Sequence, residues 1–86
     1  MSAILNTYNR KKVAFTKGKG AFLYGTNGKK YLDFVQGIAV NCLGHANNYL
    51  INSISKQAKK LWHVSNAFEI PEQERLAKRL KQKTFA

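Results

Sequence analysis

The dipeptide Asn27-Gly28 is the feature that most constrains the fold of this chain. It separates two short runs of aromatic and aliphatic residues, one ending at Tyr24 and the other beginning at Tyr31. Both Asn and Gly tolerate a positive φ angle, which the tight two-residue turns of β-hairpins require. With a further short run at 13–16, this pattern predicts that region 13–36 forms a β-hairpin or a small antiparallel meander.

The second half of the chain has a helical pattern. Apolar residues recur at three- and four-residue spacing through 47–62, which predicts an amphipathic helix capped by Asn47 or Asn48. Pro71 suits the first position of a second helix, because a proline lacks the N–H that would be unpaired there anyway. We therefore expect an α+β fragment with an arm or short helix at 1–12, the hairpin region at 13–36, a connecting segment at 37–46, a helix at 47–62, a loop at 63–70 and a helix at 71–83.

The composition restricts the possible partners. Fifteen Lys and Arg against four Asp and Glu give a net charge of +11, which points to nucleic acid or another acidic partner. The alternative is that this is part of a longer chain whose other portions carry the acids. Lysines and aromatic residues interleave through 16–34, as in a sheet that binds single strands, but a half-buried hairpin needs the same rings.

The cysteine content and the hydropathy suggest a compartment. A single cysteine excludes an internal disulfide and suits a reducing environment. No window approaches the ~18 consecutive apolar residues of a membrane span, and the start of the chain lacks the layout of a secretory signal. We therefore expect a cytoplasmic protein without a membrane partner.

Residue-level chemistry is sparse in this sequence. Cys42 and His45 are three residues apart, but such a spacing more often marks a small buried cysteine beside a turn histidine than a reactive dyad. Adding His63 gives no recognisable metal spacing, so no metal site is expected. The glycines lack a phosphate-loop pattern, Asp33 is expected on a strand, and the glutamates are expected at a helix start. No catalytic residue is expected.

Several short motifs follow one another in a specific order. A glycine-bounded hairpin ends in Tyr-Leu-Asp-Phe, and then come Gly-Ile-Ala-Val, Gly-His, Gln-Ala, Ser-Asn and Leu-Ala, at 31–34, 37–40, 44–45, 57–58, 65–66 and 76–77. From about Tyr8 onward the chain resembles the N-terminal region of the class III aminotransferases, which are pyridoxal-phosphate enzymes of fold type I. The resemblance implies that the chain is part of the small domain of such an enzyme.

Within this family, the stretches GIAVNCLGH and HVSNAF resemble most the members that act on N-acetylornithine. The resemblance implies exchange of an amino group between N-acetylornithine and 2-oxoglutarate, in arginine biosynthesis, by a homodimer acting on small molecules. Family members that act on 4-aminobutyrate, ornithine or succinylornithine remain alternatives, as does a small basic module that binds nucleic acid.

The resemblance also implies roles for particular residues. Ile38 would form an apolar wall for the substrate, with Val40 and Asn41 as neighbours. A loop near the site entrance, which could serve the partner subunit, would contribute Ser65, Asn66 and Phe68. Simple packing or turn formation is the alternative for all six residues.

Other family features differ from this sequence or are missing from it. The family usually has proline where this chain has Asn48, which is expected to cap the helix instead. The loop for the cofactor phosphate, the aspartate at the pyridine nitrogen and the Schiff-base lysine are all missing. No residue of this chain is therefore expected to bind pyridoxal 5'-phosphate, and the fragment is expected to be inactive alone.

Overall fold

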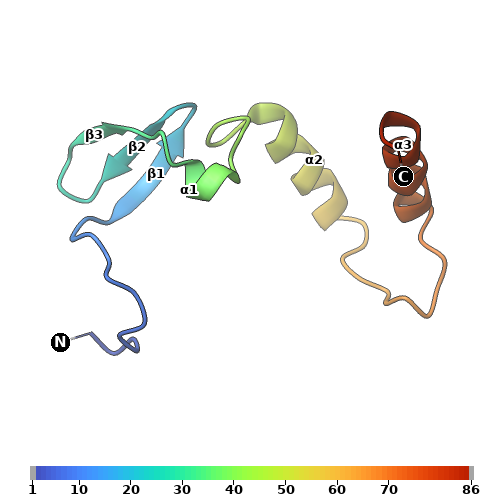
Figure 1. Ribbon diagram of the computed structural model, residues 1–86, viewed down its shortest axis with the longest axis horizontal. Coiled ribbons are helices and arrows are strands. Elements are labelled where there is room, and N and C mark those ends of the chain that lie inside the picture. The colour runs from blue at the N-terminus through green and yellow to red at the C-terminus, as the bar shows by residue number, and fades with distance from the viewer. Residues whose placement is uncertain (1, 86) are drawn as a thin grey trace. The chain divides into compact units, whose positions relative to one another are not determined.

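A three-stranded antiparallel sheet with the order β1-β2-β3 forms the first part of the fold (Figure 1). The computed structural model describes residues 2–85. Strand β1 spans Phe15–Lys19, β2 spans Phe22–Gly25 and β3 spans Lys30–Leu32. Of the two sheet forms expected from the sequence, the structure therefore has the meander. Together with the helices that follow, the sheet confirms the α+β fold class.

The turn between β2 and β3 differs in detail from the predicted two-residue turn. Only Gly28 of the Asn-Gly pair has a positive φ, at 79°. Asn27 acts through its side chain instead: Oδ1 accepts the Lys29 N–H at 3.0 Å, and Nδ2 donates to the Tyr31 hydroxyl at 2.8 Å. An Asn side chain that bonds the backbone two residues on closes a turn without a left-handed backbone of its own. The hairpin is thus confirmed, with a longer connection.

Strand β1 begins and ends later than the predicted run at 13–16. Gly18 and Lys19 lie inside this strand, and the turn to β2 falls at Gly20-Ala21. A β-carbon on Gly18 would lie 2.6 Å from His45 Cγ. The absence of a side chain at Gly18 therefore lets the His45 imidazole pack against the strand. Glycine in a strand often marks such a close approach.

The two faces of the sheet differ in character. On one face Lys17 and Lys30 flank Tyr24, because both pair with it across the strands. On the other face the rings of Phe15 and Tyr31 meet edge to face, with centroids 5.5 Å apart. This edge-to-face geometry is a favoured one for aromatic pairs.

Helix α2 spans Asn48–Ala58, and α3 spans Pro71–Lys83 with Pro71 in its first turn (Figure 1). The bounds of α3 agree with the predicted 71–83, whereas α2 ends four residues before 62. Two side chains bond to carbonyls at and after its end: the Trp62 indole N–H donates to the carbonyl of Ala58, the last helical residue, and Gln57 Nε2 donates to the Leu61 carbonyl at 2.8 Å. No helix forms between residues 2 and 12, so that segment is an arm.

The N-cap of α2 is Asn47, one of the two predicted residues. Its Oδ1 accepts the Leu50 N–H at 3.1 Å, which satisfies one of the unpaired donors of the first turn. Asn48 is the first helical residue and not the cap, contrary to the role expected for it. The first helical position is one at which proline is favoured. The difference between the family's proline and Asn48 therefore does not affect the cap at Asn47.

The chain divides into two compact units, with the boundary between Ser53 and Ile54 inside α2. Among residues 2–85 no hydrophobic side chain is buried. Phe34 is 88% exposed, and Ile38 and Trp62 are each 86% exposed. Large apolar side chains of this kind are what a protein normally buries against further structure.

We predict that the isolated 86-residue chain unfolds without a cooperative transition, because it has no buried core among its described residues. Far-UV circular dichroism against urea should change gradually, and the exposed apolar side chains should bind 8-anilinonaphthalene-1-sulfonate in the absence of urea. A single sigmoidal transition that coincides by dichroism and fluorescence, with no dye binding, would contradict this prediction.

Candidate functional site

A short left-handed turn carries the first group of predicted site residues. Element α1, at Gln36–Ala39, has φ angles of 51°, 66°, 64° and 61° in order, while Val35 before it and Val40 after it are right-handed. Left-handed backbone costs an L-residue roughly 1–2 kcal/mol, and a β-branched residue such as Ile38 is a true outlier there. The turn therefore needs its neighbours to hold it in place.

The turn presents its apolar side chains outward. Ile38 is 86% exposed, and Val40 is exposed as well. Asn41 is partly buried, and its backbone closes the turn: its N–H donates to the Gln36 carbonyl, and its carbonyl accepts the Gly44 N–H. Asn41 also borders an open cavity of about 790 Å³ in the N-terminal unit, together with Phe15, Tyr31, Asp33, Gly37 and His45.

Asp33 organises the passage from β3 into the left-handed turn. Its Oδ1 accepts the N–H groups of Val35 and Gln36, both at 3.0 Å, and Gln36 Nε2 donates back to the Asp33 carbonyl at 2.9 Å. The other side-chain atom of this amide, Gln36 Oε1, is buried and has no hydrogen-bond partner among the described residues. A buried acceptor without a partner is costly.

His45 links the same carboxylate to the sheet. Its Nε2 lies 2.6 Å from Asp33 Oδ2, and the two side chains are only 17% and 7% exposed. The His45 backbone exchanges two hydrogen bonds of 2.9 Å with Gly20. Gly44 has a φ of 83°, and a β-carbon on it would lie 3.1 Å from the Gly20 backbone, so the close approach requires glycine there.

The hydrogen bonds to Asp33 fix its charge state. The Gln36 N–H is the main cause that lowers the pKa of Asp33 below its ordinary value, followed by the His45 side chain and then the Val35 N–H. These bonds favour the ionised carboxylate, which can only accept hydrogen bonds. The proton of the short contact with Asp33 therefore lies on His45 Nε2.

Sequence reasoning missed this pair. Asp33 was expected to be only a strand residue and His45 only a turn residue, twelve positions apart. The available signal was that each residue lies in a family motif. Asp33 is in Tyr-Leu-Asp-Phe, just before the connecting segment, and His45 is in Gly-His, near the end of that segment. The expectation of a buried cysteine was wrong, because Cys42 is exposed, and its hypothetical dyad partner His45 bonds through Nε2 to Asp33 instead. Residues 2–85 contain no cluster of three potential metal-ligating side chains.

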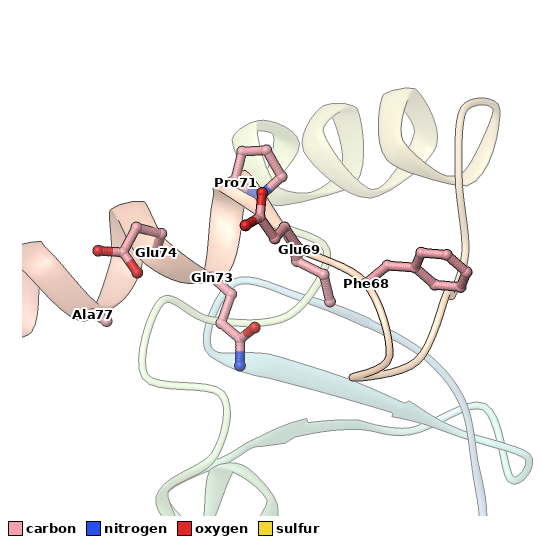
Figure 2. Close-up of a pocket in the computed structure, with 7 residues that line it drawn as sticks. Phe68, Glu69, Pro71, Gln73, Glu74 and Ala77 are labelled. Atoms are coloured by element: carbon pink, nitrogen blue, oxygen red, sulfur yellow. The ribbon is translucent and has the colours of Figure 1, made fainter.

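The second group of predicted site residues lies in the C-terminal unit, in the loop before α3. Ser65 has a φ of 68°, and its Oγ accepts the Ala67 N–H at 3.2 Å. The side chains of Asn66 and Phe68 are exposed. Phe68 borders an open cavity of about 600 Å³, which Figure 2 shows between the end of the loop and the first turns of α3 and which is also lined by Glu69, Ile70, Pro71, Gln73, Glu74 and Ala77.

The six predicted residues thus form two local groups. Ile38, Val40 and Asn41 share the left-handed turn and the residues directly after it, in the N-terminal unit. The other three share one loop of the C-terminal unit. Each group lies on one short backbone segment, and the role of its side chains towards a substrate remains a prediction.

The described residues do not fit pyridoxal phosphate. Every lysine among them is exposed, on the arm, the sheet, the turns or the helices. A lysine that forms a Schiff base is activated by desolvation or by a neighbouring cation within its pocket. Lys17 Nζ and Lys30 Nζ instead lie over aromatic rings, 4.8 Å from the Tyr24 centroid and 4.0 Å from the Phe22 centroid. No step of cofactor chemistry can be assigned to this chain.

The sequence pattern of the family described as Aminotransferase class-III matches residues 4–86. The chain belongs to this family. It is 52% identical, over 86 residues, to the acetylornithine aminotransferase of Rhodobacter capsulatus, and the match covers 100% of this chain and 22% of that protein. The chain thus spans about a fifth of the length of the curated relatives it matches.

Solved structures of this family resemble the chain as well. The N-acetylornithine aminotransferase of Stenotrophomonas maltophilia K279a superposes with a TM-score of 0.78 at 37% identity, covering 85% of this chain and 20% of that one. The ornithine aminotransferase of Toxoplasma gondii ME49 gives a TM-score of 0.74 at 31% identity, covering 79% and 16%. These matches confirm the resemblance to the class III aminotransferases and the expected fold. No helix within residues 2–85 has the length and hydropathy of a membrane span.

We predict that Asp33 titrates below the ordinary range of an aspartate in the folded full-length protein that contains this segment. Because its folded pKa is depressed, its ionised form stabilises the fold above the unfolded pKa, and this contribution is lost as the pH falls through the folded pKa. Carbon-13 NMR of aspartate-labelled protein measures the midpoint, and an Asp33→Asn variant assigns the signal.

The variant His45→Ala tests the causes of this shift. Its Asp33 midpoint should rise towards the ordinary value but stay below it, because the backbone N–H of Gln36 is the larger cause and remains in place. An unchanged midpoint would show that His45 has no part in the charge state of Asp33.

Proposed function

We propose that this chain is the N-terminal segment of an acetylornithine aminotransferase, which exchanges an amino group between N-acetylornithine and 2-oxoglutarate. The observation that carries the proposal is the left-handed turn that holds Ile38 outward, within a chain that is 52% identical over its whole length to a relative of that name. Strained backbone of this kind clusters at ligand clamps and active sites. Arginine biosynthesis, a homodimer and a cytoplasmic location belong to the same proposal.

In this proposal Ile38 is an apolar wall for the carbon chain of the amino donor. Its side chain extends from a turn whose backbone is fixed by hydrogen bonds to the carbonyls of Val35 and Gln36. Val40 lies directly after the turn and extends the apolar surface. Asn41 adds an amide beside Gly37, where its Nδ2 would lie 3.3 Å from a β-carbon.

The loop that carries Ser65, Asn66 and Phe68 is proposed to lie near the entrance of the same active site. Its support is local: the positive φ of Ser65 and the Ser65 Oγ bond to the Ala67 N–H hold the loop in a defined turn. The exposed Phe68 ring then offers an apolar face at the edge of the cavity in Figure 2.

Pyridoxal phosphate supplies the electron sink of the reaction in this family. The family's phosphate loop, pyridine-nitrogen aspartate and Schiff-base lysine have no counterpart in this sequence, so the residues holding the cofactor are proposed to lie outside this chain. The contribution of the segment is then to bind and orient the amino donor. The segment alone is proposed to be inactive.

A second candidate is an aminotransferase that uses another donor. The structural similarity to the ornithine aminotransferase of Toxoplasma gondii ME49 favours ornithine as the first alternative, ahead of 4-aminobutyrate and succinylornithine. Ornithine differs from N-acetylornithine by a charged amine in place of an acetamide. An apolar wall such as Ile38 contributes to binding the chain of either molecule, so it does not decide between them.

Nucleic-acid binding has little support from the geometry of the sheet. Single-strand binders stack bases on exposed aromatic rings. Here Lys17 and Lys30 cover the rings of Tyr24 and Phe22 in cation–π contacts. The lysines and rings therefore satisfy one another within the sheet, and nucleic acid is an improbable partner.

We predict that the full-length protein, supplied with pyridoxal phosphate, converts N-acetylornithine and 2-oxoglutarate to the semialdehyde and glutamate. Glutamate formation is measured with each candidate donor at matched concentration. The kcat/KM for N-acetylornithine should exceed those for ornithine and 4-aminobutyrate by about tenfold or more, since an unpaired charged or polar group in the site is costly. A higher value for ornithine would favour the second candidate.

We further predict that Ile38→Ala lowers kcat/KM for N-acetylornithine by roughly tenfold, because it removes about three buried carbon groups from the substrate contact. The matched control is Ile54→Ala, the same change at another exposed isoleucine, on helix α2. This control should leave kcat/KM per folded enzyme unchanged within about twofold. Equal effects of the two variants would reject the wall assignment.

A further inference from the structure

We propose that Asp33 and His45 are positioning residues that set the donor preference of the enzyme by fixing the turn that presents Ile38. This inference rests on the proposed function, because it concerns the same substrate wall. Neither residue is proposed to touch the substrate. Both act through the backbone of the segment that they close.

The first step is that the turn combines its own backbone hydrogen bonds, to the Val35 and Gln36 carbonyls, with backbone angles that L-residues disfavour. Gln36, Ile38 and Ala39 are all L-residues with φ between 51° and 64°. Such a run persists only where surrounding structure over-determines it. Without external bonds, the segment would relax to right-handed or extended backbone and move the Ile38 side chain.

The second step is that Asp33 supplies the bonds at the start of the turn. One carboxylate oxygen accepts two successive N–H groups, of Val35 and Gln36. The Gln36 side chain returns a bond to the Asp33 carbonyl. Bonds to an ionised acceptor are stronger than neutral ones, so the first residue of the left-handed run is held on both its backbone and its side chain.

The third step is that His45 attaches this arrangement to the sheet from the far end of the segment. The imidazole contacts the second oxygen of Asp33, and its ring packs where Gly18 leaves room on β1. The His45 backbone pairs with Gly20 in both directions. The segment from 34 to 44 is therefore a loop closed at its base, with Ile38 near its middle.

The low exposure of the pair strengthens this closure. With side chains 7% and 17% exposed, Asp33 and His45 interact in a medium that screens charge less than bulk water does. Solvent therefore competes weakly for either group. Loss of the carboxylate would release the Val35 and Gln36 N–H groups and the imidazole at the same time.

The experiment uses the full-length holoenzyme and compares two donors, N-acetylornithine and the short amino acid L-alanine, whose side chain is too short to reach a distal wall. The readout is the ratio of their kcat/KM values. Asp33→Ala should lower this ratio about tenfold, as Ile38→Ala does, because the wall is no longer held in place. The double variant should show no additional loss, since the two changes remove the same contact.

Conservative variants separate positioning from general stability. Asp33→Asn keeps an oxygen that can accept both N–H groups, so it should retain most of the wild-type ratio. His45→Ala keeps the Gly20 backbone bridge and should lower the ratio about threefold, which provides the test if Asp33→Ala does not fold. A role in stability alone would reduce the amount of active enzyme and leave the ratio unchanged in every variant, and that result would overturn the proposal.

Hydrogen exchange provides a readout independent of activity. In the wild-type protein the peptide that covers 34–44 should be protected, in Asp33→Ala it should exchange faster, and in Asp33→Asn protection should return. Equal protection in all three proteins would overturn the positioning role. A wild-type enzyme that forms no glutamate with any donor would instead reject the proposed function, and the role in donor preference with it, even where the exchange pattern is as expected.

Discussion

The short hydrogen bond between Asp33 and His45 is the interaction on which the geometry of the N-terminal unit depends. Asp33 follows the last strand of the sheet, and His45 bonds back to the turn between β1 and β2. Residues 36–39 between them form the only left-handed run within residues 2–85, and one turn of backbone hydrogen bonds to the Val35 and Gln36 carbonyls closes it. The Asp33 carboxylate accepts hydrogen bonds from the imidazole and from two backbone N–H groups. It therefore fixes the end of the sheet relative to the start of the turn.

The glycines around this pair show how closely the backbone segments approach one another. Gly18 lets the imidazole lie on β1, and Gly44 lets its own segment approach Gly20 within contact distance. A side chain at either position would push His45 away from Asp33. The sheet, the loop and the Asp33–His45 hydrogen bond are therefore one local structure, which forms without a buried hydrophobic side chain among the described residues.

The sequence predicted what depends on local chemistry and missed what depends on contacts across the chain. The hairpin, Asn47 as one of two possible caps and the bounds of α3 follow from turn, cap and propensity rules that involve only neighbouring residues. The end of α2 was placed too late, because Leu61 and Trp62 continue the apolar period while side-chain bonds to carbonyls end the helix. The left-handed turn could not be predicted, since Gln36, Ile38 and Ala39 have no local preference for positive φ.

This difference also explains why the candidate site was only half visible in the sequence. Ile38 was found because the family resemblance singles out its motif, whereas the residues that fix its position are separated from one another by twelve positions and meet only in the folded chain. Exposed apolar side chains in this part of the protein are of the kind that proteins normally bury against further structure. The proposed substrate wall therefore depends on rigidity within its own segment, where the Asp33 carboxylate holds the N–H groups of Val35 and Gln36.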